Sequence, residues 1–345
     1  MPKHLPIFGI FGHHNSGKTT LIEHLLPRLH ERDLSVVVAK VHGSHLEVDT
    51  PGKDSHRLFE AGADVFLQGK TEGFLRRHTD AGDSVAADLA DLARRYDLVL
   101  VEGRRRAPCE KIWLLGKGET DPPTDSGPVL DVLAPDADRV DAAWRILDKW
   151  LTRRWLQAPV YGCVLIGGKS RRMGTPKHLL ETGGVAWIEQ TVALLRAAVE
   201  RVAIVGGGHV PLGLSNVIRL SDVPDADGPM AGLLAAMRWA PHVSWLAAAC
   251  DLPNLSAEAL EWLLSTRSPG VWATLPRLPD DKRVEPLLAH YDFRARTVLQ
   301  GAVAEGRFSL SALAEHPKVN TPPPPADLLD AWANVNSPDD FSRRV

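Results

Sequence analysis

Short apolar runs alternate with longer amphipathic stretches along this chain, and they form two successive series. In the first series we expect strands at 5–11, 35–41, 64–67 and 96–103, and helices at 17–32, 55–61 and 141–156. In the second we expect strands at 160–166, 201–205, 217–220, 243–251 and 284–291, and helices at 185–199 and 233–239. The stretch 116–135 is rich in Gly, Pro, Asp and Thr, which predicts a loop. Strands that alternate with helices favour an α/β fold.

Two complete strand-first series predict two domains. We expect the boundary near residue 157, where a helix ends before Pro159 and a new apolar strand begins. This gives domains 1–157 and 158–345, and each has enough chain to bury its own core. Because no long flexible stretch separates the two series, the domains are expected to pack together.

Composition narrows the classes of function. With 44% hydrophobic and 24% charged residues, the chain has the balance of a soluble globular protein. A net charge of −3 provides no overall basic field, which argues against a nucleic-acid partner. The sequence shows no apolar run of membrane-spanning length and no apolar leader at its start, so we expect a cytoplasmic protein without a membrane partner. Cys109, Cys163 and Cys250 are widely spaced, and we expect inert thiols rather than a zinc site.

The first candidate site follows the first strand. The stretch Gly12-His-His-Asn-Ser-Gly-Lys-Thr19 is a full G-x-x-x-x-G-K-[ST] match between a strand and a helix. In such a loop the main-chain amides surround a phosphate, Lys18 reaches its oxygens and Thr19 presents a hydroxyl to Mg²⁺. Glu102, at the end of strand 96–103, is the candidate carboxylate for the same metal; a surface carboxylate is the alternative. The predicted nucleotide-binding residues here are Gly12, Asn15, Ser16, Gly17, Lys18, Thr19 and Thr20.

A second glycine-rich loop follows the strand 160–166. In Leu165-Ile-Gly-Gly-Lys-Ser-Arg-Arg-Met-Gly-Thr-Pro-Lys177 the glycines allow an anion to approach main-chain amides closely. Arg171, Arg172 and Lys177 add positive charge, and no acidic residue interrupts the loop. The loop therefore suits a polyphosphate, although a solvated basic turn would have the same composition.

Carboxylates and a third glycine-bearing stretch complete the candidate chemistry of the second series. Asp251 follows the strand 243–251 at the sheet edge where α/β proteins place ligand groups, and we assign it to Mg²⁺. An N-cap role for Asp251 is the alternative, although Ser256 already serves that purpose. The stretch Gly228-Pro-Met-Ala-Gly232 precedes a helix and suits an anion, and Asp222 stands at the head of its loop.

The second series resembles a known family. The pattern G-G-x-S-x-R-M-G-x-x-K after an apolar strand is similar to the signature loop of nucleotidyltransferases, above all the molybdenum cofactor guanylyltransferase (MobA) family. C-D-x-P at 250–253, G-P-M-A-G at 228–232 and N-V-N-S-P at 334–338 extend the resemblance over most of residues 160–342.

This resemblance implies a Rossmann-like nucleotidyltransferase sheet that transfers GMP from MgGTP to the terminal phosphate of molybdopterin, with release of pyrophosphate. It implies catalytic roles for Lys177, Arg172 and Asp251, the last of which holds Mg²⁺. The implied nucleotide contacts are Leu165, Ile166, Gly167, Gly168, Lys177, Asp222, Gly228, Gly232 and Asp251. The implied acceptor contacts are Glu285, Asn334 and Asn336, although Glu285-Pro286 stands where some relatives carry His-Pro.

The first series resembles the MobB family, the P-loop accessory proteins of the same pathway. Besides the P-loop, the matching elements are V-D-x-P-G-K-D-S at 48–55, E-A-G-A at 60–63 and D-L-V-L-V-E-G at 97–103. The resemblance implies a P-loop NTPase-like sheet that binds GTP through Lys18 and Thr19, assists delivery of the cofactor and hydrolyses GTP weakly at most. It also implies molybdopterin-synthesis proteins and molybdoenzymes as candidate partners, and a homo-oligomer formed through this domain. The histidine-rich segment at 41–45 is only partly kept, and the run 104–106 is unusually basic.

Both resemblances lead to one hypothesis, a fused enzyme that makes the guanine dinucleotide form of the molybdenum cofactor. One alternative keeps the fold and changes the substrates, to cytidylyl transfer or to transfer onto a sugar phosphate. Another alternative is a nucleotide-gated carrier of the cofactor without catalysis. Asp251 and the loop cations argue for catalysis.

Overall fold

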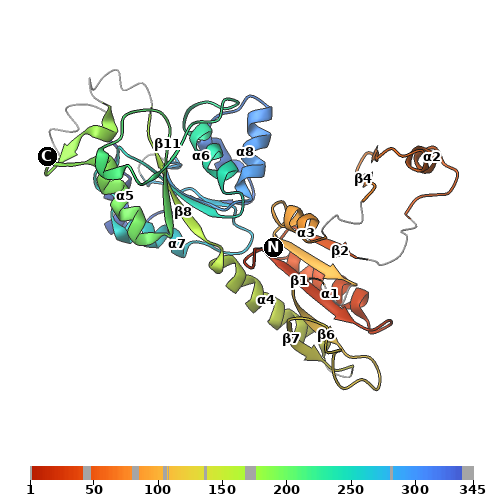
Figure 1. Cartoon of the computed structure of the whole chain (residues 1–345). Helices are drawn as coiled ribbons and strands as arrows, with labels where there is room; N and C mark the ends of the chain where they lie inside the picture. Colours follow the sequence, from red (N-terminus) through yellow and green to blue (C-terminus); the bar gives the residue numbers. More distant parts are fainter. Residues whose placement is uncertain are drawn as a thin grey trace.

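The computed structural model describes residues 2–41, 48–79, 85–103, 107, 109–135, 138–167, 176–279 and 283–335. Two sheets that share no strand follow one another along the chain, and Figure 1 shows helices packed against each. The prediction of an α/β fold is thereby confirmed. Among the described residues, no helix is both long and apolar enough to cross a membrane.

The N-terminal sheet has the strand order β2-β5-β1-β6-β7, and all its pairings are parallel. Its strands are β1 Ile7–Gly12, β2 Val36–Lys40, β5 Leu98–Glu102, β6 Glu110–Leu114 and β7 Val129–Leu133. Helices α1 Lys18–His30 and α4 Arg139–Gln157 cover one face, and α3 Val85–Ala93 covers the other. The inner strand β5, between β2 and β1, is buried at every position, as expected for a parallel strand covered on both faces.

Two expectations for this part of the chain were wrong or incomplete. The stretch 116–135 is not all loop, because it contains β7. That strand lies at the edge of the sheet, exposes Leu130 and Asp131 and pairs with β6 through an irregular register, so its hydrophobic pattern is weak. Strand β6, the short strand β4 Gly73–Arg76 and helix α3 were not predicted.

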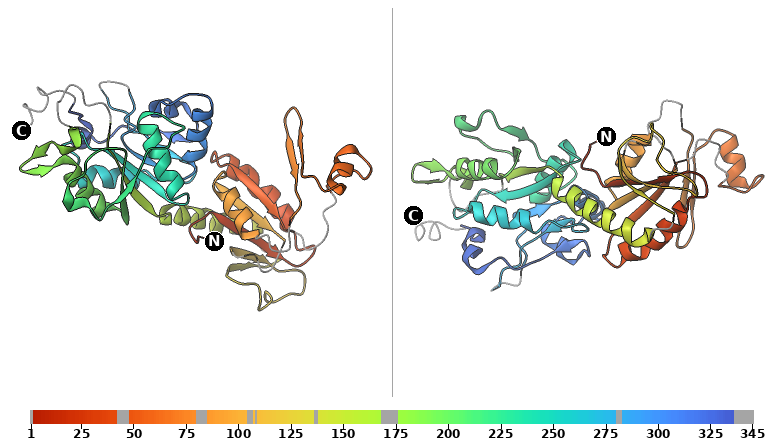
Figure 2. Two further views of the ribbon diagram at one scale, coloured as in Figure 1. Left: turned by 45° about the horizontal axis from the view of Figure 1, so that its top comes forward. Right: turned by 90° about the horizontal axis from the view of Figure 1, so that it is seen from below.

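A separate arm leaves the N-terminal sheet between β2 and α3. We use "the arm" for residues 48–79, which contain α2 Asp54–Glu60 and the antiparallel pair β3 Val65–Gln68 and β4 Gly73–Arg76. Figure 1 and Figure 2 both show α2 and this hairpin standing away from the sheet. The pair of strands belongs to neither large sheet.

The C-terminal sheet has the order β12-β11-β8-β13-β15-β14-β16. Its strands are β8 Val160–Leu165, β11 Arg201–Val205, β12 Ile218–Leu220, β13 Ser244–Ala249, β14 Ala273–Thr274, β15 Leu288–Tyr291 and β16 Val319–Asn320. Strands β8, β11, β12 and β13 are parallel, whereas β15 runs antiparallel to β13. Helices α5 Trp187–Ala198 and α7 Ala257–Ser265 cover one face, and α6 Gly228–Trp239 and α8 Ala295–Ala304 cover the other.

Shorter elements complete this part of the chain. A small hairpin is formed by β9 Glu181–Thr182 and β10 Val185–Ala186, and single 3₁₀ turns span Lys177–Leu179, Leu212–Leu214, Leu310–Glu315 and Ala326–Trp332. Two boundaries differ from the prediction. Helix α6 begins at Gly228, because Pro229 fits the first turn of a helix, so G-P-M-A-G lies inside the helix rather than before it. Strand β13 ends at Ala249, and Asp251 lies just beyond it.

The two sheets are joined through α4, which ends at Gln157 only a few residues before β8 begins (Figure 1). Asp97, at the amino end of β5, is fully buried and accepts hydrogen bonds from Trp272 Nε1 at 2.6 Å and Lys318 Nζ at 2.7 Å. Arg294 donates to the Tyr96 carbonyl at 3.0 Å. These contacts bury the amino end of β5 against residues that flank strands of the second sheet. The carboxyl end of β5 lies at the opposite edge of the first sheet.

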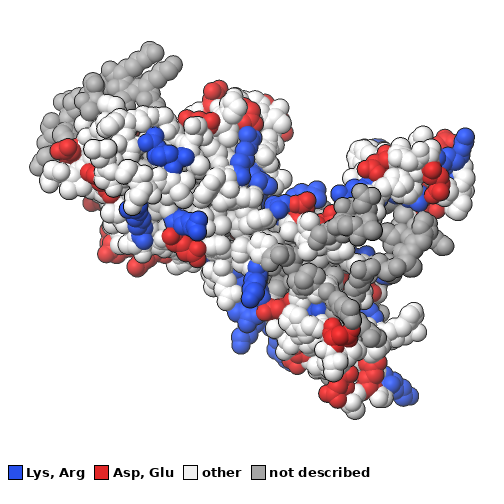
Figure 3. All heavy atoms as spheres, viewed as in Figure 1, with Lys and Arg blue, Asp and Glu red and all other residues white. Residues whose placement is uncertain are grey.

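Charge is distributed without a dominant sign. Figure 3 shows basic and acidic side chains interspersed over the face in view, in keeping with the small net charge. Local groups of charged residues must therefore supply any strong anion binding.

Candidate functional site

A cavity of about 520 Å³ opens at the carboxyl ends of β8 and β13. At this point the strand order reverses, because β8 has β11 on one side and β13 on the other. Open α/β sheets bind ligands at such a switch point. Eight of the predicted nucleotide contacts line the cavity: Leu165, Ile166, Gly167, Lys177, Asp222, Gly228, Gly232 and Asp251.

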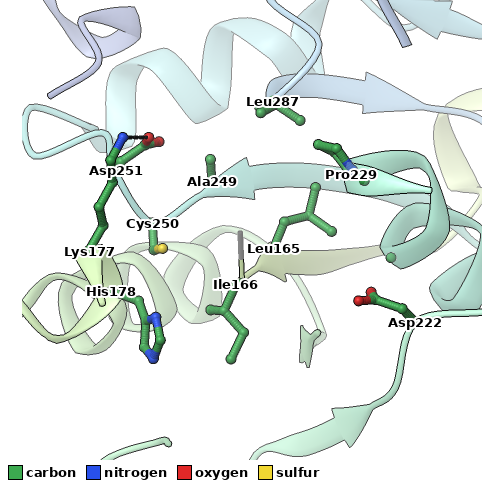
Figure 4. A pocket seen from close by; sticks show the side chains of 13 residues that line it. Leu165, Ile166, Lys177, His178, Asp222, Pro229, Ala249, Cys250, Asp251 and Leu287 are labelled. Atoms are coloured by element: carbon green, nitrogen blue, oxygen red, sulfur yellow. Dashed lines mark hydrogen bonds and ion pairs between the residues drawn. The ribbon is translucent and has the colours of Figure 1, made fainter. Parts of the chain in front are cut away.

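An ion pair lies on one side of the cavity. Lys177 Nζ is 2.8 Å from Asp251 Oδ2, and the two side chains are only 21% and 20% exposed (Figure 4). Lys177 opens the 3₁₀ turn 177–179, and Asp251 follows β13, so the pairing of β8 with β13 brings together residues that are far apart in sequence. The two side chains with the clearest predicted roles in phosphate and metal binding thus contact each other directly.

Asp222 lies on the other side of the cavity from this pair (Figure 4). Burial raises the pKa of its carboxyl group above the ordinary value. A Cβ atom on Gly232 would lie 2.7 Å from Leu165 Cδ2 and 3.2 Å from Asp222 Oδ1, so a larger residue there would displace the Leu165 side chain that lines the cavity. The cavity therefore has polar groups at two ends and close-packed backbone between them, which suits an elongated ligand.

Two further residues of the lining were not predicted. His178 Nε2 lies 2.8 Å from the His209 carbonyl, and burial lowers its pKa, which favours the neutral imidazole. Cys250 is buried, and burial raises the pKa of its thiol to about 12. Such a thiol is protonated at neutral pH and is a poor nucleophile. All three cysteines are free and buried.

Several predicted contacts lie outside this cavity or outside the described residues. Gly168, Arg171, Arg172 and Asn336 belong to segments that the structure does not describe. Glu285 and Asn334 are described but do not line the cavity. The Val335 amide donates to the Asp251 carbonyl at 3.1 Å, so the segment that carries Asn334 passes beside the ion pair.

The P-loop forms a second candidate site at the carboxyl end of β1. Lys18 Nζ donates to the His13 carbonyl at 2.6 Å, and Asn15 and Gly17 have positive φ values of 60° and 83°. These values lie in the left-handed region, which turns the loop back on itself before α1 begins. Burial, as the largest cause, lowers the pKa of Lys18. In this structure the lysine is held inside the curve of the loop where a phosphate would lie.

Thr19 and Glu102 meet beside this loop. Thr19 Oγ1 donates a hydrogen bond to Glu102 Oε1 at 2.8 Å, and Glu102 is only 6% exposed. The register of β1 against β5 places Glu102 opposite Ile10, next to the start of the loop. The alternative of an exposed strand-end carboxylate is therefore wrong for Glu102, because the side chain is buried against the loop.

The oxygen donors at both sites fit Mg²⁺ held together with a substrate. Within the described ranges, no group of three or more His, Cys, Asp or Glu residues could hold a metal ion alone. Mg²⁺ commonly uses one or two carboxylates and completes its shell with phosphate oxygens and water. Asp251 at one site, and Thr19 with Glu102 at the other, supply that kind of partial shell.

Comparisons with known proteins divide the chain in the same way as the sheets. Residues 162–318 match the family model described as MobA-like NTP transferase domain, and residues 7–134 match that of molybdopterin guanine dinucleotide synthesis protein B. A molybdenum cofactor biosynthesis bifunctional protein of Synechocystis is 32% identical over 192 residues, which are 54% of this chain and 54% of that protein. The match therefore spans about half the length of that relative.

Two relatives match one half of the chain each. A probable molybdenum cofactor guanylyltransferase of Pelotomaculum thermopropionicum is 30% identical over 52% of this chain and 89% of its own length. A molybdopterin-guanine dinucleotide biosynthesis adapter protein of Haemophilus influenzae is 38% identical over 35% of this chain and 70% of its own length.

Proposed function

Because the chain belongs to the molybdopterin-guanine dinucleotide biosynthesis adapter family in its N-terminal part and to the molybdenum cofactor guanylyltransferase family in its C-terminal part, we propose that it transfers GMP from GTP to molybdopterin. The C-terminal part is a nucleotidyltransferase, and the N-terminal part is its fused accessory unit. The observation that best supports the proposal is the Lys177–Asp251 pair in the cavity at the switch point.

The reaction is a direct in-line transfer. An oxygen of the terminal phosphate of molybdopterin attacks the α-phosphorus of GTP, and the bond from the α-phosphorus to the oxygen bridging to the β-phosphate breaks. Pyrophosphate leaves with the electrons of that bond. The protonated thiol of Cys250 is unsuited to forming a covalent intermediate, which favours direct attack.

The residues of the cavity act mainly through charge and position. Lys177 neutralises the triphosphate, and the backbone at Gly167 approaches it closely. Asp251 holds Mg²⁺ against the phosphates; when bound, the metal stabilises the charge that develops on the leaving pyrophosphate. Arg172 and Gly168 stay predicted contacts to the same triphosphate. Asp222, at the other end of the cavity, contacts the nucleoside in this proposal.

The N-terminal unit binds a second GTP in its P-loop. Lys18 contacts the phosphates, and Thr19 and Glu102 supply oxygen ligands for Mg²⁺. Its role is to assist delivery of the cofactor, with hydrolysis that is slow at most. Asn334 is proposed to contact the acceptor, because its segment passes beside Asp251. Glu285 and Asn336 stay predicted acceptor contacts.

The nucleotide and the product test this proposal together. Purified protein is incubated with molybdopterin, Mg²⁺ and either GTP or CTP, and pyrophosphate release is followed in parallel with mass spectrometry of the product. We expect release with GTP and a product heavier by GMP. Faster release with CTP would instead identify a cytidylyltransferase, and binding of GTP without pyrophosphate release would identify a carrier.

We also propose that the chain forms a homodimer through the arm. Leu58, Phe66 and Leu75 are 56%, 64% and 60% exposed there, and a two-stranded ribbon is only marginally stable alone. A second copy offers the same apolar side chains and free strand edges, so hairpin can pair with hairpin. Light scattering should give twice the chain mass for the wild type and the chain mass for Phe66→Ser with Leu75→Ser. Monomeric wild-type protein at micromolar concentration would contradict this.

A further inference from the structure

A second cavity, of about 640 Å³, lies at the base of the arm and takes no part in either site described above. We call it the arm cleft. Its walls are the end of β2, the inner side of α3 and the arm itself. Arg77 Nη2 donates to Asp88 Oδ1 at 2.6 Å, which fastens the end of the hairpin to α3.

An ordered stack of side chains forms one wall of the arm cleft. The guanidinium carbon of Arg76 lies 3.7 Å from the centre of the Phe59 ring, and the His78 ring is stacked on the same phenyl ring at 3.8 Å with an angle of 9°. His78 is held in turn by contacts of its ring with the Phe59 carbonyl and of its amide with Asp64. The wall is therefore built from groups that hold one another in place.

Arg76 is buried in this wall and is paired with an acidic residue of the arm. Its side chain is 9% exposed, and Nη1 lies 3.6 Å from Asp49 Oδ2, too far for a hydrogen bond. Neither of these two atoms has a hydrogen-bond partner among the residues that the structure describes. The two charged groups nevertheless form an ion pair at this distance, which holds the Arg76 guanidinium in the wall of the arm cleft.

The remaining lining combines positive charge with apolar surface. Lys40 and Arg77 join Arg76 as cations, against the single carboxylate of Asp88. The ring of Phe74 and the aliphatic side chains of Val85, Leu89 and Leu92 on α3 supply the apolar surface. Guanidinium and ammonium groups bind phosphate, and arginine and phenyl faces stack on flat rings. We propose that the arm cleft binds a planar aromatic molecule that carries a phosphate group.

The position of the arm cleft relates this ligand to the P-loop. Lys40 pairs in register with Glu102, and Glu102 accepts the hydrogen bond of Thr19. Lys40 is thus at the same sheet edge as the P-loop, so the arm cleft lies next to the candidate nucleotide site. Two molecules of the proposed reaction share this chemistry, a phosphorylated pterin and a guanine nucleotide. The choice between them rests on the proposed function, whereas the existence of the site does not.

Calorimetric titrations of the full chain test the proposal. The probes are neopterin monophosphate and GMP, with neopterin and inorganic phosphate as the two halves of the ligand. Asp251→Asn is the background for all titrations, so that binding in the C-terminal cavity is weakened in every sample. We expect one phosphorylated aromatic probe to bind at one site per chain, and each half alone to bind at least tenfold more weakly.

Variants locate the binding. Lys40→Ala and Arg77→Gln should each lower the affinity for the phosphorylated probe about tenfold, which is the effect of losing one charge-assisted hydrogen bond. The affinity for neopterin should stay unchanged. Lys70→Ala removes an exposed cation from the turn of the same hairpin and should have no effect. Circular dichroism shows whether each variant keeps its fold.

Three outcomes would overturn the proposal. Wild-type affinity in both cleft variants would place the binding elsewhere. Displacement of the probe by GTP in the Asp251→Asn background, but not when Lys18→Ala is added to it, would make the cleft a part of the nucleotide's own site. Loss of the dimer in the cleft variants with unchanged probe binding would make the cleft a subunit contact. Transfer activity measured separately in wild-type protein decides the proposed function, so the two can fail independently.

Discussion

Replacing Lys177 by methionine is expected to change metal and nucleotide binding in opposite directions. In the protein without nucleotide, Lys177 Nζ lies 2.8 Å from the carboxylate that we assign to Mg²⁺. A divalent cation that arrives alone must displace the ammonium group before it can bind Asp251. A cation that arrives with a triphosphate meets no such competition, because the phosphates provide the lysine with another partner. Lys177→Met should therefore strengthen binding of the free cation and weaken binding of MgGTP.

The geometry sets the size of both effects. Two unit charges at 2.8 Å attract by about 6 kcal/mol at an effective dielectric constant of about 20. Desolvation offsets most of this, since both side chains are largely buried. A hydrogen bond between charged groups retains about 1.5–3 kcal/mol. We therefore expect the cation to bind roughly 10- to 100-fold more tightly, and MgGTP to bind more weakly by a similar factor.

Electron paramagnetic resonance of free Mn²⁺ measures the first effect, and calorimetry with MgGTP measures the second. The double variant Lys177→Met with Asp251→Asn gives the background from the P-loop site. Lys149→Met is the matched control, because it removes an exposed lysine on α4. Unchanged or weaker Mn²⁺ binding in Lys177→Met would refute the reasoning, since the lysine would then not compete for the carboxylate.

Four further predictions follow from single side chains. Asp251→Ala should slow pyrophosphate release by roughly 10²- to 10⁴-fold; near-normal turnover would remove the metal assignment. Lys18→Ala should remove one of two GTP sites in calorimetry while pyrophosphate release persists. Gly232→Ala should raise the KM for GTP, because its Cβ would lie 2.7 Å from a side chain of β8; unchanged kinetics would show that α6 can move. The buried ring of His290 has no hydrogen-bond partner among the residues that the structure describes, and burial lowers its pKa from 6.5 to about 3. Below pH about 6.5 the unfolded chain therefore binds a proton at this residue that the folded chain does not. The free energy of unfolding then falls by about 1.4 kcal/mol for each unit by which the pH is lowered. Urea unfolding measures this free energy at pH 7.5 and at pH 5.5. The decrease between the two should be about 1 kcal/mol smaller in His290→Leu than in the wild type, and an equal decrease would contradict this.

The sequence predicted best what is local to one strand and the loop that follows it. The P-loop and the stretch 165–177 each follow an apolar run, so both candidate phosphate sites could be located from neighbouring residues alone. The Lys177–Asp251 contact could not be predicted, because it depends on β8 lying beside β13 in the sheet. The role of Asp97 was missed for the same reason. It belongs to the motif 97–103, but its partners Trp272 and Lys318 come from the other half of the chain.

The sequence pattern also gave a wrong helix start and no sign of the arm cleft. Proline normally argues against a helix, and Pro229 led us to start α6 too late, although the first turn of a helix accepts it. The arm cleft had no sequence signature at all. Phe59, Arg76 and His78 come from two different elements of the arm, and only their folding back on one another creates the stack.

The contacts of Asp97 with Trp272 and Lys318, here called the joint, set the distance between the two candidate sites. It holds the two sheets together at the amino ends of β5 and β13, whereas both candidate sites open at carboxyl ends of strands. Each site therefore lies a strand length, roughly 15–20 Å, beyond the joint. In the proposed function, a cofactor that leaves one site would therefore cross solvent along the outside of the protein to reach the other. The fused chain supplies the two units in equal numbers and keeps that distance short.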